Sequence, residues 1–497
     1  MTHKVSGGIR QVWGRVILKG AGAMQDSTFH RVRSGLQDQD PETRKAAIRA
    51  CESPTAGMEK DLIREIAQRL KDRDNDVRRA AVRVLGQQKD RADNEMIQRL
   101  DGWLNSELWY VRCSSLSVLE KWRDRIGTRV MGHMVDALLD EDWRIRLKTL
   151  DILREVKSKL PQAKIQEIAG WVNHERRDCR IFALRALGIL SPRVEGPGFQ
   201  KIVHGLADKD PAVRITSLGV LVKFKEKMDS RILMRIATRL GDKQPGVRIA
   251  AVDILRFFKN DLDAQTKACI EAKTADQDPS VRIAALRAME ALQVDMGEGI
   301  DHKMLHLLKD PCGDVRATAL KAWRKSQKRL DDSVIGRTME MLNDDRWEVR
   351  QEALRLLQRV HDRIDDEGLK TIVFRLSDDS VQVRKSAVQT LGTMKDRLHG
   401  EHLNAIFQGL HAHRPGVRVA TLFGVELVVD RLDQAQMMKI STCLYDEDRA
   451  VRLTALFILG QCPKLRLGDE IMKAILTKLL DSDPSVRLFA THVLAEI

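Results

Sequence analysis

Hydrophobic and polar positions recur along this chain with a period of 34 residues. When the chain is aligned on one arginine of each period, the spacing is constant until the last arginine, which follows after 35 residues. These arginines are Arg44, Arg78, Arg112, Arg146, Arg180, Arg214, Arg248, Arg282, Arg316, Arg350, Arg384, Arg418, Arg452 and Arg487. The alignment therefore contains fourteen repeats, with one residue inserted between Lys464 and Asp469. A fixed period of this length is typical of a repeat protein.

The positions before this arginine predict a first helix, a turn and the start of a second helix. Leucine stands eight residues before it in twelve repeats and ends an amphipathic stretch such as residues 58–70. Aspartate stands six residues before it in eleven repeats, and proline stands three residues before it in six. A second aspartate, four residues before the arginine, is suited to cap the next helix. That aspartate occurs as Asp40, Asp74, Asp142, Asp210, Asp278, Asp448 and Asp483.

The positions after the arginine predict the buried face of the second helix. Three residues after it the side chain is always that of Ala, Ser or Thr, one further on it is aliphatic in thirteen repeats, and seven after it is usually Leu. Spacings of 3, 4 and 7 define one helix face, and the small residue lets a neighbouring helix approach closely. One such hairpin cannot bury its apolar face alone, but stacked hairpins can. We therefore predict an all-α fold over residues 26–497, an α-solenoid of about fourteen hairpins forming a curved superhelical rod.

The recurring phrase Asp-x-Asp-Pro-x-Val-Arg-x-x-Ala, complete at residues 276–285, resembles the HEAT repeat. The resemblance is strongest to the short repeats of phycobilin lyases and covers about residues 24–497. Tetratricopeptide repeats share the 34-residue period, but their Trp-Leu-Gly-Tyr signature is absent. The HEAT resemblance implies that the aspartate and arginine columns form a ladder of hydrogen bonds between successive turns. The fourteen arginines are therefore assigned to structure.

The composition excludes a disordered or membrane-spanning chain. Hydrophobic residues make up 43% and charged residues 31%, and no apolar run approaches the roughly 20 residues of a bilayer-spanning helix. The seven cysteines are isolated from one another, which indicates reduced thiols in an intracellular protein, cytoplasmic or organellar. Residues 1–25 carry four Lys or Arg residues and no acidic one. This segment has two interpretations, a mitochondrial or plastid targeting peptide and a capping helix for the solenoid.

Motifs of enzymes and metal sites are scarce in this sequence. The iron site of deoxyhypusine hydroxylase, which has a related scaffold, requires several His-Glu pairs, and the chain has one, at 174–175. His402 and His411 bracket a helix about 13 Å long, so one ion cannot join them. His302 and His306 lie one helical turn apart, but no carboxylate completes a zinc motif. We predict no catalytic residue, cofactor or metal site, with chromophore handling as a minor alternative.

Basic residues mark the turn between successive repeats, thirteen positions after the aligned arginine. They are Arg91, Arg125, Lys159, Arg193, Lys227, Arg329, Arg363, Arg397 and Arg431. Stacking aligns them along one edge, and such a stripe can follow a phosphate backbone. An aspartate directly precedes several of them, which weakens the local positive field and favours ordinary solvated turns.

Aromatic residues appear where the repeat departs from its own pattern. The early aspartate is missing from the third, fifth and twelfth repeats, and the third places Trp109 and Tyr110 in the turn. Trp143 and Trp347 occupy the column of Trp109 in the fourth and tenth repeats. Two interpretations stay open: these rings anchor a partner, or they cover the helix end where other repeats carry proline.

These patterns predict a non-enzymatic scaffold or adaptor, a subunit of a larger assembly that binds acidic or helical proteins along its surface. The exposed positions of the second helices mix both charges, which suits a protein partner better than nucleic acid. The apolar final helix predicts that another subunit covers this end. The net charge of +14 and the basic edge support an alternative, an RNA-binding component of an organellar ribonucleoprotein.

Overall fold

The computed structural model describes residues 26–52, 59–91, 93–292, 302, 305–325, 330–462 and 464–496. The regular elements within these ranges are all helical. The predicted N-terminal segment 1–25 and the predicted edge residue Arg329 lie outside them. The chain divides into an N-terminal unit, Met1–Ile254, and a C-terminal unit, Leu255–Ile497, each described by itself below.

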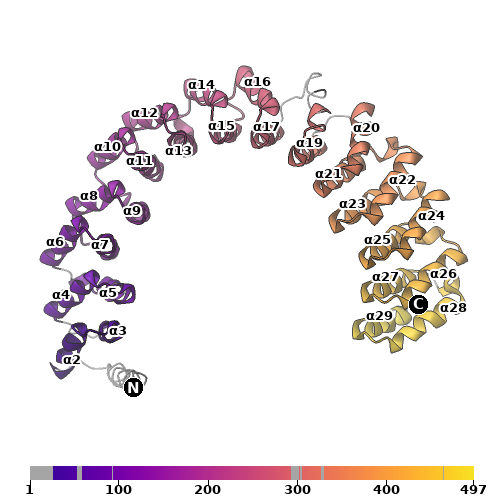
Figure 1. Cartoon of the computed structure of the whole chain (residues 1–497), viewed down its shortest axis with the longest axis horizontal. Helices are drawn as coiled ribbons and strands as arrows, with labels where there is room; N and C mark the ends of the chain where they lie inside the picture. Colours follow the sequence, from indigo (N-terminus) through magenta and orange to yellow (C-terminus); the bar gives the residue numbers. More distant parts are fainter. Residues whose placement is uncertain are drawn as a thin grey trace. The chain divides into compact units, whose positions relative to one another are not determined.

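The N-terminal unit consists of stacked helical hairpins, as the 34-residue period predicts. Figure 1 shows the first helices of these hairpins in one row and the second helices in another, on the inner side of the unit's bend. The first helices are α2 (Asp26–Leu36), α4 (Lys60–Gln68), α6 (Asn94–Gly102), α8 (Thr128–Asp136), α10 (Gln162–Gly170), α12 (Gly196–His204) and α14 (Ser230–Ala237). The second helices are α3 (Pro41–Arg49), α5 (Asn75–Gln87), α7 (Trp109–Lys121), α9 (Trp143–Val156), α11 (Arg177–Ile189), α13 (Pro211–Leu221) and α15 (Pro245–Phe257), whose last turn passes into the other unit.

The C-terminal unit repeats this arrangement (Figure 1). Its described first helices are α16 (Ala264–Ala272), α20 (Asp332–Glu340), α22 (Asp366–Phe374), α24 (Glu401–Gln408), α26 (Gln434–Thr442) and α28 (Lys464–Thr477). Its second helices are α17 (Pro279–Leu292), α19 (Gly313–Lys325), α21 (Trp347–Leu357), α23 (Val381–Gly392), α25 (Pro415–Glu426), α27 (Arg449–Gly460) and α29 (Pro484–Glu496).

Short 3₁₀ helices close both kinds of turn. One set follows the first helices: η1 (Arg69–Lys71), η3 (Trp103–Asn105), η4 (Ala137–Leu139), η5 (Trp171–Asn173), η7 (Gly205–Ala207), η9 (Thr238–Gly241), η10 (Lys273–Ala275), η11 (Met341–Asn343), η13 (Arg375–Ser377), η15 (Gly409–His411), η17 (Cys443–Tyr445) and η18 (Lys478–Leu480). The other set joins consecutive repeats: η2 (Lys89–Arg91), η6 (Ser191–Arg193), η8 (Val222–Lys227), η12 (Gln358–Arg363), η14 (Lys395–Arg397) and η16 (Val429–Arg431). The predicted helix at 58–70 is thus α4 followed by η1.

The predicted caps and the predicted core column are confirmed. Each of the seven aspartates four residues before the aligned arginine accepts hydrogen bonds from backbone amides of the following helix turn. The small residue three positions after the arginine is at most 1% exposed in every repeat, from Ala47 to Ala490. Larger side chains such as Trp122 and Trp323 are also almost fully buried. The hairpins therefore share a continuous apolar interior within each unit, which stabilises them by burial.

A ladder of arginine–aspartate pairs runs beside this core. In each complete rung the aligned arginine binds the aspartate of the following repeat, at N–O distances of 2.7–2.9 Å. Nine of these rungs lie within one of the two units: Arg44–Asp72, Arg112–Asp140, Arg180–Asp208 and Arg214–Asp242 in the N-terminal unit, and Arg282–Asp310, Arg316–Asp344, Arg350–Asp378, Arg418–Asp446 and Arg452–Asp481 in the C-terminal unit. The ladder that the resemblance implied is therefore present.

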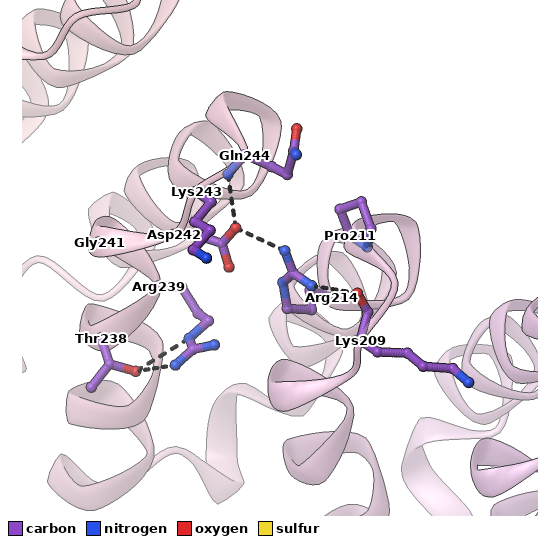
Figure 2. A pocket seen from close by; sticks show the side chains of 9 residues that line it. All are labelled: Lys209, Pro211, Arg214, Thr238, Arg239, Gly241, Asp242, Lys243 and Gln244. Carbon is purple, nitrogen blue, oxygen red and sulfur yellow. Dashed lines mark hydrogen bonds and ion pairs between the residues drawn. The ribbon is translucent and has the colours of Figure 1, made fainter.

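Each rung also closes two turns. Figure 2 shows one example, in which Nη2 of Arg214 and the backbone amide of Gln244 both donate to Oδ1 of Asp242, at 2.8 and 3.0 Å. Nη1 of Arg214 donates to the carbonyl of Asp208, 2.8 Å away in its own turn. One arginine thus satisfies carbonyls that the turn leaves open and ties that turn to the next repeat.

Candidate functional site

Shallow hollows lie beside the rungs, between the turns of consecutive repeats. The hollow in Figure 2, of about 420 Å³, is bordered by four basic residues and one acid: Lys209, Arg214, Arg239 and Lys243, and Asp242. Arg214 is paired with Asp242, and Arg239 donates to the carbonyl of Leu206 and to Thr238. The lysines give this stretch of the turn edge an excess of positive charge, which suits an anionic group of a partner.

The histidine positions considered from sequence do not assemble a metal site. Within the described residues, no group of three or more His, Cys, Asp or Glu side chains is arranged to hold a metal ion. His302 and His306 line a hollow of about 510 Å³. His402 is buried, with Nε2 3.3 Å from the carbonyl of Asp366, whereas His411 lines a different hollow.

The basic residues of the inter-repeat turns reach back to the preceding turn. Nη1 of Arg397 donates to the carbonyl of His361 at 3.0 Å, and Nζ of Lys159 binds Asp124 at 2.8 Å. The same backward contacts are made by Arg125, Arg193, Lys227, Arg363 and Arg431, and Arg91 ends η2 at the equivalent place. These side chains therefore connect consecutive turns, and their predicted binding role stays a prediction.

Tyr110 and Trp109 form a stack around two arginines. Arg78, which has Ser106 in place of a rung aspartate, lies 4.5 Å from the ring centre of Tyr110. The Arg144 guanidinium lies 3.4 Å from the ring centre of Trp109, and the two rings meet edge to face at 6.0 Å. A cation over an aromatic face is attracted by the negative face of the ring. These two rings thus have structural contacts in the third repeat, and the two interpretations, partner anchor or cover of the helix end, stay predictions.

The fifth repeat replaces its missing rung differently. His174 stands at the rung position, and its Nδ1 accepts the backbone amide of Arg176 at 3.0 Å. Arg146 of the preceding repeat is 3.6 Å from Asp178, two positions before the aligned arginine. Tyr110 occupies that same column in the third repeat. In the third and fifth repeats, the residue two positions before the aligned arginine therefore contacts the arginine of the preceding repeat in place of the missing rung aspartate.

Trp143 and Trp347 project further into solvent. They begin helices α9 and α21, where other repeats have proline, and their exposed fractions are 60% and 39%. Neither ring is enclosed by its own helix. Both stay predicted partner contacts.

An apolar row on the second helices was missed by the sequence reasoning. The residue directly after the aligned arginine is Leu147 in α9, Ile181 in α11 and Ile215 in α13, three helices that pack consecutively. Leu147 is 45% and Ile215 38% exposed, while Ile181 is half-buried. The sequence carried a sign of this row, because the same column changes from Lys45 and Arg79 in the first two repeats to aliphatic residues in the fourth to sixth.

The last repeat also exposes apolar side chains. Leu480 in η18 is 89% exposed and Leu488 in α29 is 75% exposed. The covering subunit that the sequence predicted at this helix stays a prediction.

The buried cysteines are suited to packing rather than to nucleophilic chemistry. Burial raises the pKa of Cys51 to about 12, and burial, followed by the charge of Asp446, raises the pKa of Cys443 to about 11. Because the thiolate is the reactive form, both thiols are held in their inert state.

Comparison with known families identifies the repeat. A sequence model of HEAT repeats matches residues 29–120, and a model described as the HEAT repeat associated with sister chromatid cohesion matches residues 369–391 and 462–487. Both fall on the hairpins and rungs described above. The chain is a HEAT-repeat α-solenoid. Neither matching family is catalytic.

Solved structures share the solenoid fold. Kap121p bound to RanGTP superposes with a TM-score of 0.61 at 14% identity, over 95% of this chain and 56% of that one. Kap121p bound to Nup53p gives 0.61 at 12% identity, over 95% and 57%. A structure of Kap95p binding to RanGDP gives 0.56 at 14% identity, over 95% and 66%. The solenoid thus spans just over half the length of Kap121p, a karyopherin, and the likeness shows the fold alone.

The chain has no curated relative among the proteins compared, and its described helices are not of the membrane-spanning kind. A search of curated proteins finds no match to this solenoid. None of the helices in the described ranges has both the length and the apolar character needed to cross a membrane.

Proposed function

We propose that this HEAT-repeat solenoid is a non-enzymatic scaffold that binds protein partners along its row of second helices. The observation that carries the proposal is the exposed apolar row of α9, α11 and α13: Trp143 and Leu147, then Ile181, then Ile215. Contiguous exposed apolar side chains on a folded surface mark protein interaction sites. The similar karyopherin structures include Kap121p bound to protein partners, RanGTP and Nup53p among them, which supports a scaffold role for the same fold.

The spacing of the row favours a helical partner. Packed helices lie roughly 8–10 Å apart, so each repeat offers one apolar side chain per step of that length. Along an α-helix, residues seven apart on one face are separated by about 10.5 Å. An amphipathic partner helix lying across the repeats therefore places one apolar residue against each repeat.

The charges beside the row favour an acidic partner. The hollow with Lys209 and Lys243 lies at the turn edge of the sixth and seventh repeats, and it is lined by Pro211 and Arg214 of α13, the helix that carries Ile215. Acidic residues of a partner helix that flank its apolar face would meet these lysines. We assign the protein to an intracellular assembly, where thiols such as that of Cys51 stay reduced.

The test is a double substitution in the row, Leu147→Arg with Ile215→Arg. Lys45 and Arg79 occupy the same column in the first two repeats, so the fold accepts a basic side chain there. The tagged full-length chain and the double variant are each purified from the native cell, and the proteins that accompany them are quantified by mass spectrometry. A partner identified in this way is then titrated in purified form, and we expect its affinity to fall at least about tenfold, as for loss of a central apolar contact.

A matched control is Met234→Arg, because Met234 is 61% exposed but lies on α14, in the row of first helices. This variant should bind like the unmodified chain. Equal binding by all three proteins would contradict the proposal. RNA recovered in place of protein, with an affinity that falls steeply as salt rises, would favour the ribonucleoprotein alternative.

A further inference from the structure

The twelfth repeat departs from every other repeat at its rung. The position six residues before its aligned arginine, Arg418, holds Ala412 instead of aspartate. Ala412 has no side-chain acceptor, whereas Ser106 and His174, in the other two repeats without the aspartate, each accept the backbone amide two residues on. The column that compensates in those repeats, through Tyr110 and Asp178, holds Gly416 here.

Two donors that normally share one carboxylate are consequently left without an acceptor. In the preceding rung, Nη2 of Arg350 and the backbone amide of Ser380 both donate to Oδ1 of Asp378, at 2.7 and 2.9 Å. The equivalent donors in the twelfth repeat are Nη2 of Arg384 and the backbone amide of Arg414. Across the described part of the chain, neither of these two groups has an acceptor, and Nε of Arg384 has none either.

Arg384 is nevertheless held in the rung position. Its exposed fraction is 7%, and Nη1 donates to the carbonyls of Asp378 and Asp379, at 2.7 and 3.1 Å. Nη2 lies so close to Gly416 that a Cβ there would come within 2.7 Å of it. Burial lowers the pKa of Arg384, whereas the hydrogen bonds that Arg350 donates to Asp378 raise the pKa of Arg350. Nε and Nη2 are thus unpaired in a guanidinium with nine-tenths of its surface buried, and an anion that meets them would stabilise it.

The neighbouring carboxylates do not supply that anion, because each has a cation of its own. Asp378 binds Arg350, Asp379 binds the side chain of Arg414, and Asp446 binds Arg418. Ala412 is half-buried and Gly416 is exposed, so the rung position opens to solvent.

We propose that the twelfth repeat binds a carboxylate of an acidic protein partner, which completes the rung in place of the missing aspartate. The carboxylate accepts hydrogen bonds from Nε and Nη2 of Arg384 and from the backbone amide of Arg414, the donor set that holds Asp378 in the preceding rung. The inference rests on the proposed function for the identity of the partner, and it adds a specific recognition site in the C-terminal unit. A carboxylate is favoured over a phosphate because the donor set is that of an aspartate rung, which is planar and bidentate.

The site is tested by a titration that needs no partner. The full-length chain is labelled with ¹⁵N-arginine, and the Nε–H signal of Arg384 and the amide signal of Arg414 are followed as acetate replaces chloride at constant ionic strength. We expect both signals to shift together and to saturate. Inorganic phosphate is titrated in a parallel arm, and a stronger response to phosphate than to acetate would overturn the assignment to a carboxylate.

Ala412→Asp supplies the carboxylate from within the chain, and Ala412→Asn is its uncharged match. Because eleven repeats carry aspartate at this column, Ala412→Asp is expected to fold. It should show both signals already shifted and no further response to acetate, while Ala412→Asn should leave the Nε–H signal of Arg384 near its original position. No response in the unmodified chain, or an undiminished one in Ala412→Asp, would refute the site.

The same variant separates this inference from the proposed function. A purified partner should bind Ala412→Asp at least about tenfold more weakly than the unmodified chain, as for loss of a charged contact. If acetate binds but partner affinity is unchanged, the carboxylate does not come from that partner, and the inference fails while the scaffold proposal stands. If the Leu147→Arg and Ile215→Arg variant binds normally while Ala412→Asp does not, the apolar row fails and the rung site stands.

Discussion

The guanidinium of Arg350 forms two hydrogen bonds of 2.7 Å with the carboxylate of Asp378, which lies 28 residues further along the chain. The side chains of both residues are largely buried, with exposed fractions of 12% and 3%. The pair therefore joins two consecutive hairpins across a largely buried contact. Its loss has a cost that can be measured.

Asp378→Ala should lower the free energy of unfolding of the C-terminal unit by about 3 kcal/mol, since it leaves a buried guanidinium without its anion. Hydrogen exchange of the amides in α21 and α23 measures the effect locally, which matters because long repeat arrays do not unfold in one step. The control is Asp151→Ala, which breaks a pair with Arg154 whose members are 54% and 57% exposed. That change should stay within about 0.5 kcal/mol. Equal effects of the two substitutions would contradict a structural ladder.

Tyr110→Ala should destabilise the second and third repeats by about 1–2 kcal/mol, because Arg78 loses the ring that covers it. Tyr110→Phe keeps the ring and should change little. Ser106→Asp, combined with Tyr110→Ala, should restore much of the loss by creating an ordinary rung. Urea unfolding followed by the exchange of α5 and α7 amides tests all three. If Phe is as harmful as Ala, the hydroxyl rather than the ring supports Arg78.

Acid should weaken the ladder. Burial by itself would raise the pKa of Asp242, but hydrogen bonds from Arg214 and from the amide of Gln244 outweigh it and hold this pKa below its ordinary value of 3.8. The pKa values of Asp72, Asp344 and Asp481 are lowered by the same balance. Because the unfolded chain then binds more protons than the folded one, stability is complete above about pH 4 and is lost as pH falls through the lower folded values.

Urea midpoints measured from pH 6 down to pH 2 test this dependence. The midpoint should stay level and then fall below about pH 4. Asp242→Asn should begin from a lower midpoint and fall less steeply. A midpoint that does not change between pH 5 and pH 3 would argue against ionised rung carboxylates.

Cys51 and Cys443 should resist alkylation while the protein is folded. With the pKa of Cys51 raised to about 12, its thiolate at pH 8 is on the order of 1,000-fold scarcer than that of an ordinary thiol. Mass spectrometry of iodoacetamide-treated protein, with and without urea, measures the rate at each site. Fast labelling of Cys51 in the folded protein would mean that α3 opens readily.

The repeat and the hairpins follow from sequence because each column reports one local requirement, whereas the ladder was expected from the resemblance to HEAT repeats. The seven N-cap aspartates and the buried small column recur often enough for their physical reason to be evident. A residue that replaces the rung aspartate in a single repeat is harder to predict. Tyr110 was recognised as an unusual residue, but its contact with Arg78 depends on how two hairpins stack.

The candidate surfaces were predicted less well than the fold. The basic column of Arg397 and its equivalents was recognised, but its backward contacts to carbonyls of the preceding turn depend on three-dimensional proximity. The apolar row of Leu147, Ile181 and Ile215 was overlooked because attention fell on the charged positions of the same helices. In the twelfth repeat, Ala412 was noted as a break, but the unpaired donors of Arg384 and Arg414 become evident only when the rungs are compared in space.

The inserted residue before the last repeat lies near Gly468, which breaks the helical geometry within α28 with a φ of 65° that is accessible mainly to glycine. Arg452, before the insertion, still pairs with Asp481, after it, at 2.9 Å, although 29 residues rather than 28 separate them. The linker between hairpins can thus change length while the rung keeps its register. An epitope tag or a fluorescent reporter is therefore best inserted in this linker, where it would allow the protein to be followed in living cells without disrupting the stacked repeats.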